Sequence, residues 1–286
     1  MSPLAQLVAE ELAQPVDPRV RTMAETLAAK YPGASRAVLF YGSCLRESQL
    51  DGLMLDFYLI VSDYRAAYGD NWLAWVNRLV PPNVFPFEHD GMMAKYAVLS
   101  EADFHRLNGP ETRNVSVWAR FAQPSRLVWS ADADAQAKAI DAVSRAAPTL
   151  LAAAGSIDGE APLDWWRRAF ALTYSVELRA ERKSRSNSVV DADPTRYEQF
   201  SAPAIAAIPP NAVGSSWARR RIEGKLLSIA RLAKAAFTYS GGIDYLAWKI
   251  NRHAGTQIEI KPWQRKWPLL AAFVLVPKLL AKGAVR

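Results

Sequence analysis

The residues best suited to handle a phosphate group or a metal ion lie close together, between positions 38 and 62. The pair Gly42-Ser43 follows the apolar run 37–41, and Asp56 interrupts a second apolar run, 53–61. Because glycine lacks Cβ, backbone N–H groups in such a turn can approach phosphate oxygens. A carboxylate in a strand is costly to bury without a partner, and carboxylate oxygens are ligands that Mg²⁺ prefers. A tight hairpin turn, with Asp56 paired to a core arginine, would give the same pattern.

Two cations further along the chain could neutralise phosphate charge. Lys95 lies inside the apolar run 92–99, where a bare ammonium group is disfavoured. Arg120 precedes the segment 121–124, and arginine forms bidentate contacts with phosphates. The structural alternatives are a strand-edge lysine that reaches solvent and an arginine paired within the fold.

The segments that carry these residues resemble one known family. A strand, a Gly-Ser turn and an acid-bearing strand is the layout of nucleotidyltransferases. The amino-acid sequence of these segments is similar to that of the mitochondrial-type phosphatidate cytidylyltransferases and their bacterial relatives. The resemblance covers about residues 37–250 and rests on four segments in order: Tyr41-Gly42-Ser43 with Met54-Leu55-Asp56-Phe57, then Lys95-Tyr96-Ala97-Val98-Leu99-Ser100, then Ala119-Arg120-Phe121-Ala122-Gln123-Pro124, and Thr173-Tyr174 with Glu177 and Arg179.

The resemblance implies an α/β (α+β) fold in three parts. Residues 1–155 would form a nucleotidyltransferase domain. Residues 156–260 would form a mostly helical domain, which is winged-helix-like in the family. Residues 261–286 would be an amphipathic, membrane-associating tail.

The implied reaction converts CTP and phosphatidic acid to CDP-diacylglycerol and pyrophosphate, with Mg²⁺ as cofactor. By resemblance, the metal ligands would be Asp56 and Glu177. The nucleotide would be bound by Tyr41, Gly42, Ser43, Lys95 and Arg120. The substrate phosphate would meet Arg120, Tyr174 and Arg179. Asp56, Lys95 and Glu177 would be the catalytic set.

This sequence departs from the family at several of these places. Cys44 replaces a glycine, Glu177 stands where the family favours Asp, and the loop after Asp63 has Trp72 in place of a Trp-His pair. In most nucleotidyltransferases a second acid follows two residues after the first, and Tyr58 occupies that place here. A second metal ligand would therefore come from elsewhere. The candidates are Asp51, which resembles a turn residue, Asp63, which resembles a helix cap, and Glu177.

Composition is that of a globular protein. The chain has 286 residues, of which 50% are hydrophobic and 22% charged, and a single cysteine excludes an intrachain disulfide. We find no secretory signal and no apolar run of the roughly 18–20 residues that span a bilayer. The expected location is the cytoplasmic side of a membrane, peripherally bound at its inner face.

Charge is unevenly placed along the chain. Residues 217–286 hold 14 of the 35 Lys and Arg but 3 of the 28 Asp and Glu, a net charge of +11 in a protein of +7. This favours an anionic partner surface. Residues 217–237 should form a basic helix. Tryptophans beside a short apolar segment favour a bilayer interface over nucleic acid, and the membrane candidates are Trp263, Arg265, Lys266, Trp267 and Lys278. A solvated helix face or a tail packed on the body would show the same pattern.

Helical periodicity predicts one helix over residues 4–30 and a long amphipathic helix over 163–183. In the latter, Tyr174 and Glu177 would share a face. The pair Trp72 and Trp75 should lie in the core or in a groove wall.

Two other functions fit the same sequence features. The chain could transfer a nucleotide to another acceptor, such as RNA, a protein or a soluble phosphate. It could also be a non-catalytic, peripheral membrane or RNA-binding protein with the same fold.

Overall fold

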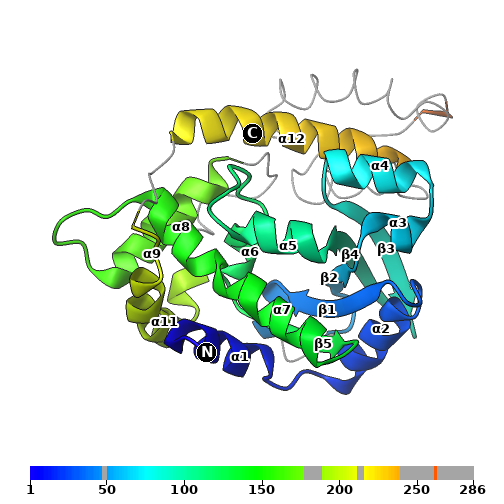
Figure 1. The fold of residues 1–286 in the computed structure, drawn as a ribbon, viewed down its shortest axis with the longest axis horizontal. Coiled ribbons are helices and arrows are strands. Elements are labelled where there is room, and N and C mark those ends of the chain that lie inside the picture. The colour runs from blue at the N-terminus through cyan, green and yellow to red at the C-terminus, as the bar shows by residue number, and fades with distance from the viewer. Residues whose placement is uncertain (47–49, 177–188, 211–215, 239–260, 263–286) are drawn as a thin grey trace.

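A five-stranded mixed sheet forms the centre of the computed structural model, which describes residues 1–46, 50–176, 189–210, 216–238 and 261–262 (Figure 1). The strand order is β3-β4-β2-β1-β5. Their bounds are β1 Ser35–Tyr41, β2 Met54–Val61, β3 Asn83–His89, β4 Met92–Ser100 and β5 Ser125–Ser130. The strands predicted at 37–41, 53–61 and 92–99 are thus confirmed.

The register of the sheet aligns three of the predicted site positions. Strand β1 runs antiparallel to β2, so that Tyr41 pairs with Asp56. Strand β2 runs parallel to β4, so that Asp56 pairs with Lys95. Tyr41, Asp56 and Lys95 therefore form one row across three neighbouring strands. Since β4 lies between β2 and β3, Lys95 is not on an edge strand.

Helices cover both faces of the sheet. Their bounds are α1 Pro3–Leu12, α2 Pro18–Ala28, α3 Tyr64–Tyr68, α4 Trp72–Leu79, α5 Glu101–Asn108, α6 Trp118–Phe121, α7 Ala133–Ser144, α8 Ala146–Ala154, α9 Pro162–Tyr174, α11 Pro194–Ala206 and α12 Trp217–Thr238, with a 3-10 turn, η1, at Ser43–Arg46. The face with Phe57 and Leu59 packs on α2 through Val20, Met23 and Leu27. Alternation along β2 sends Asp56, Tyr58 and Ile60 to the other face, which α5, α6 and α7 cover.

The core of that second face continues into the helices after residue 155. Buried Trp166 and Phe170 of α9 and Tyr197 of α11 belong to the same hydrophobic cluster as Leu39 and Tyr58 of the sheet. The domain boundary near residue 155 stays a prediction, as does the winged-helix-like character of the second part. What the structure shows is a mixed sheet followed by a mostly helical region.

Two predicted helices were wrong in extent. The segment 4–30 forms two helices, because Pro15 and Pro18 cannot donate backbone hydrogen bonds and Asp17 caps a new start by accepting from Arg19 N. The helix predicted over 163–183 ends at Tyr174. There the Ser175 hydroxyl donates to Leu172 O at 2.6 Å, a local bond that competes with helical pairing.

Candidate functional site

Asp56 lies at the centre of the row that the sheet aligns. Its Oδ1 is 2.9 Å from the Lys95 Nζ, and the side chains are 20% and 29% exposed. Oδ1 itself is buried and accepts no hydrogen bond of good geometry. Its contact with Lys95 is therefore an ion pair without a hydrogen bond. The partner of Asp56 is therefore Lys95 and not the core arginine considered as an alternative. The parallel strands β2 and β4 bring the two residues together.

Gly42 directly follows β1 and lies against the same carboxylate. Its φ of +97° is a conformation that side chains with a Cβ rarely adopt, and a Cβ built there would lie 3.2 Å from Asp56 Oδ2. The turn continues into η1, where Leu45 N donates to Gly42 O at 3.2 Å. The Gly-Ser turn predicted from sequence is thus present, and its backbone approaches Asp56 closely.

Aromatic rings fill the sheet face next to Asp56. Tyr58 is 2% exposed, and its ring centroid lies 5.2 Å from that of Tyr41 and 5.1 Å from that of Phe121. The position at which many nucleotidyltransferases carry a second acid is therefore part of the core. Tyr41 also meets Phe121, at 6.0 Å, so α6 packs directly over the end of β1.

Arg120 lies on α6, whose Phe121 packs on Tyr41 and Tyr58. The guanidinium Nη1 donates to Ser116 O one turn earlier, and the residue is half-buried. Arg120 is thus carried by an element that touches Tyr41 and Tyr58, with its guanidinium bound to the start of that element.

Sequence reasoning missed Arg126 on β5. It pairs in register with Phe40, one residue before Tyr41, and its Nη1 donates to Ser125 O at 2.8 Å. Burial lowers the pKa of Arg126, and within the described part of the chain it forms no ion pair with a carboxylate. The signal was present in the sequence, since an arginine directly before the apolar residues 127–129 needs a partner when it is buried.

Two of the alternative metal ligands have structural roles. Asp51 is 62% exposed and its Oδ1 lies 2.9 Å from Arg19 Nη1. Asp63 caps α3 by accepting from Arg65 N and Ala66 N. Asp63 also follows the far end of β2, roughly 20 Å along the strand from Asp56 at about 3.3 Å per residue.

The third candidate, Glu177, lies outside the described residues, as do Arg179 and the five tail residues Trp263, Arg265, Lys266, Trp267 and Lys278. Tyr174 is the last residue of α9 and packs half-buried against the cluster that contains Tyr58. Its predicted contact with a substrate phosphate stays a prediction.

The described residues offer a metal ion one carboxylate at this place, Asp56, and no group of three potential ligands occurs among them. Mg²⁺ is commonly held by one or two carboxylates together with substrate phosphates and water. The close backbone of Gly42 and the buried, weakly bonded Oδ1 of Asp56 fit that mode, in which the substrate completes the coordination.

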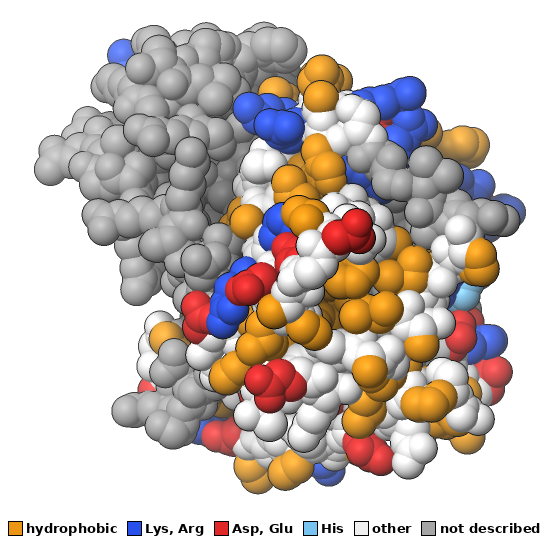
Figure 2. All heavy atoms as spheres, turned by 90° about the vertical axis from the view of Figure 1, so that its left-hand side faces the viewer, with side chains coloured by type: hydrophobic (Ala, Val, Ile, Leu, Met, Phe, Trp, Pro, Cys, Tyr) orange, Lys and Arg blue, Asp and Glu red, His pale blue; other side chains and the backbone are white. Residues whose placement is uncertain are grey.

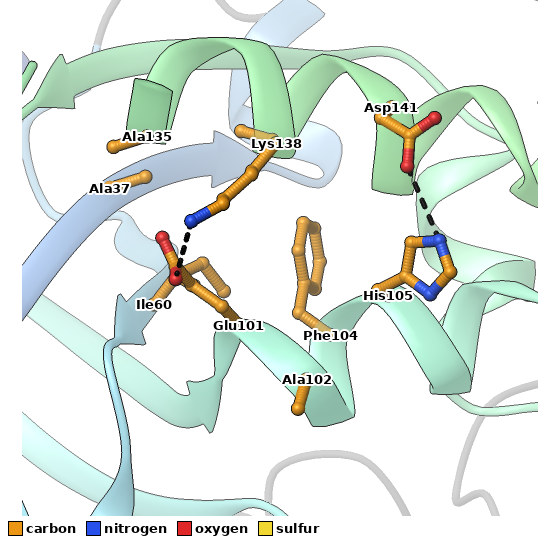
Figure 3. A pocket seen from close by; sticks show the side chains of 10 residues that line it. Ala37, Ile60, Glu101, Ala102, Phe104, His105, Ala135, Lys138 and Asp141 are labelled. Carbon is orange, nitrogen blue, oxygen red and sulfur yellow. Dashed lines mark hydrogen bonds and ion pairs between the residues drawn. The ribbon is translucent and has the colours of Figure 1, made fainter. Parts of the chain in front are cut away.

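A pocket of about 250 Å³ lies on the same sheet face but at the other end of β2 (Figure 3). Ala37, Ile60 and Phe104 line it, and its rim carries the pairs Lys138–Glu101 at 3.5 Å and His105–Asp141 at 3.2 Å. None of the predicted site residues lines it.

No family model matches the chain, and no curated protein sequence matches it. Among the described residues, no helix is both long and apolar enough to cross a membrane.

Proposed function

We propose that this protein is a Mg²⁺-dependent nucleotidyltransferase that transfers the cytidylyl group of CTP to phosphatidic acid. The observation that carries the proposal is the juxtaposition of Gly42, Asp56 and Lys95 at the end of β1. A glycine turn, a carboxylate and a lysine meet there within one row of the sheet. These are the groups that phosphoryl transfer needs, since its catalysis consists largely of positioning and charge neutralisation.

In this proposal each group has one task. The Gly42-Ser43 turn binds the triphosphate through backbone N–H groups, and Tyr41 holds the turn by packing on Tyr58 and Phe121. Lys95 and Arg120 neutralise phosphate charge. Asp56 would hold Mg²⁺, which would offset the negative charge that develops on the phosphate oxygens. The phosphate of the lipid attacks the α-phosphorus in line. One P–O bond forms while the bond to the departing pyrophosphate breaks.

The ion pair between Asp56 and Lys95 is then the arrangement without substrate. An incoming triphosphate competes with Asp56 for Lys95, because it carries more negative charge than a single carboxylate. That exchange would release Asp56, the residue that would hold the metal, from its pairing with Lys95. Without a phosphate, the same pair keeps two charges compensated in a site that is mostly shielded from water.

The test is pyrophosphate release with CTP, Mg²⁺ and phosphatidic acid in mixed micelles. Asp56→Asn should lose at least about 100-fold in rate, since it removes the charge that holds the metal. The matched control is Asp51→Asn, which removes an equally charged side chain paired with Arg19 at the surface and should retain activity. Full Mg²⁺-dependent activity in the Asp56→Asn variant would contradict this mechanism.

One observation favours a non-catalytic function instead. The described residues supply a single carboxylate, which is already paired, and Tyr58 stands at the place of a second acid. A protein of that kind would bind nucleotide weakly or not at all. Thermal unfolding with and without CTP and Mg²⁺ separates the two cases, because only a nucleotide-binding protein gains stability from the ligand.

A further inference from the structure

Helix α12 contacts the body of the protein through three of its basic residues. Arg220, Arg231 and Lys234 all face the body of the protein. Arg220 donates to Arg113 O at 2.8 Å, Arg231 to Pro81 O at 2.7 Å, and Lys234 to Pro82 O at 2.6 Å. Gly224 completes this inner side, since a Cβ there would lie 2.3 Å from Val176 Cγ1. These cations hold the helix by binding backbone carbonyls, and Trp217 at its start packs against the hydrophobic core.

The outer side of α12 exposes an apolar stripe. Ile222, Leu226 and Ile229 follow at intervals of four and three residues, which places them on one face, and they are 64%, 62% and 40% exposed. Arg219, Arg221 and Lys225 are also exposed on this helix. Figure 2 shows basic and hydrophobic side chains intermixed at the top of the molecule, where α12 begins.

Helix α4 exposes a second apolar stripe. Trp72, Trp75 and Leu79 are 48%, 67% and 74% exposed and lie at intervals of three and four residues. Of the two places predicted for these tryptophans, the core is excluded, because Asn77 occupies the inner side of α4, where it binds Val98 O and Asn83 N. Trp75 instead lines a pocket, which agrees with the groove wall that was the other prediction. Lys234 donates to Val80 O and Pro82 O, so α12 is bound to the segment that directly follows α4.

A pocket of about 330 Å³ lies between α3 and α4, beside Trp75. Its lining includes two guanidinium groups. That of Arg65 pairs with Asp70 at 2.7 Å, and that of Arg78 has no carboxylate partner within the described residues. An indole next to an arginine at the mouth of a pocket suits a ligand with an anionic head and an apolar body.

We propose that α4 and the outer face of α12 form one membrane-docking surface, in which the α3–α4 pocket receives the phosphate of an anionic phospholipid. Charge and polarity together select this occupant. Apolar side chains enter the interface, while exposed arginines and lysines meet anionic headgroups. The inference extends the proposed function by naming the surface that would meet the lipid.

Vesicle co-sedimentation tests it without CTP or Mg²⁺, so its outcome does not depend on the proposed reaction. The full-length protein should bind vesicles of phosphatidylcholine mixed with phosphatidic acid more tightly than vesicles of phosphatidylcholine alone, and salt should weaken the difference. Arg78→Gln should reduce the partition coefficient about fivefold. The charge-matched control is Arg21→Gln, at an exposed position of α2, which should leave the partition coefficient unchanged.

Apolar variants test the two stripes. Leu79→Ser on α4 and Leu226→Ser on α12 should each weaken binding about tenfold, since each removes a buried apolar side chain from the interface. Ile157→Ser changes an equally exposed residue elsewhere and should have no effect. All five positions are exposed, so circular dichroism should show unchanged folding.

Three outcomes would overturn the proposal: equal or no binding to both vesicle types, Arg78→Gln behaving like Arg21→Gln, or a concentration-dependent dimer that Leu79→Ser or Leu226→Ser converts to monomer. The last would assign the surface to a second copy of the chain.

Discussion

Gly42 is constrained by two independent features, its backbone conformation and its neighbour. Gly52 has a similar positive φ, +74°, but nothing lies within 4 Å of the place of its Cβ. Both Gly→Ala variants should lose roughly 1 kcal/mol of unfolding free energy from the conformation alone. Gly42→Ala should lose more, because the new methyl group meets Asp56 Oδ2. Urea unfolding of the two variants measures the difference, and equal losses would contradict the close approach.

The Asp56–Lys95 pair should be visible in a double-mutant cycle. Lys95→Met leaves a mostly shielded carboxylate without its cation and should cost about 1–3 kcal/mol in unfolding free energy. Adding Asp56→Asn removes that uncompensated charge and should restore part of the loss. Chemical denaturation of the wild type, both single variants and the double variant gives the coupling energy. Additive losses would show that the two side chains do not interact.

At this scale the sequence was informative where a strand fixed the geometry. Asp56 and Lys95 each interrupt an apolar run, and a charge in such a run demands a partner. Their pairing with each other was not predicted, because the register between two strands whose paired residues lie 39 positions apart does not follow from either strand alone.

Among the elements, α1 and α11 are joined by a buried ion pair. Arg196 Nη2 donates to Glu11 Oε1 at 3.0 Å, and its Nη1 donates to Ala122 O at 3.1 Å. Burial alone would lower the pKa of Arg196, but Tyr197 and Glu11 outweigh it and the pKa is raised. The pair connects residues 185 positions apart, a distance at which sequence periodicity gives no guidance.

Breaking this pair should destabilise the fold strongly. Glu11→Gln should cost about 3–5 kcal/mol in unfolding free energy, because Arg196 would remain buried without its counter-ion. The control is Asp191→Asn, which removes an exposed partner of Arg167 and should cost less than about 1 kcal/mol. Denaturant midpoints measure both, and similar losses would contradict the importance of burial.

Lys234 should make the stability of the protein depend on pH. Burial, with Arg231 adding to it, lowers the pKa of Lys234 to about 7, whereas an unfolded lysine titrates near 10.4. Between these values the unfolded chain binds a proton that the folded protein does not. The free energy of unfolding should therefore rise with pH across this window.

The comparison for this prediction is Lys234→Met, which removes the titrating group and should show a smaller rise. Urea unfolding of both proteins at about pH 7 and about pH 9 measures the two slopes. Parallel slopes would show that Lys234 is protonated throughout and that its bonds to Val80 O and Pro82 O compensate for burial.

Helix α12 shows the limit of amphipathic patterns. The sequence correctly predicted a basic helix at 217–237, but the basic residues lie on both its buried and its exposed sides. Which face turns inward is decided by the carbonyl groups of residues 80–82 and 113, which lie far away in the chain. A pattern identifies two faces but does not say what each will meet.

For the whole molecule, charge and fold separate along the chain. The sheet and its site belong to residues 1–216, which carry a net charge of −4, while the rest carries +11. Part of that positive charge is used internally, since Arg220, Arg231 and Lys234 bind backbone carbonyls. In the proposed docking to an anionic surface, the attraction would come from Arg78 of α4, from the exposed basic residues of α12 and from the chain beyond it.

The central claim is tested most directly by pyrophosphate release from the purified protein with Mg²⁺ and each of the four nucleoside triphosphates, with and without phosphatidic acid in mixed micelles. The account predicts release with CTP alone among the four, and only when the lipid is present. No pyrophosphate release with any of the four, and no thermal shift on adding nucleotide and Mg²⁺, would contradict the account and favour a non-catalytic protein. Release without the lipid would contradict the lipid acceptor.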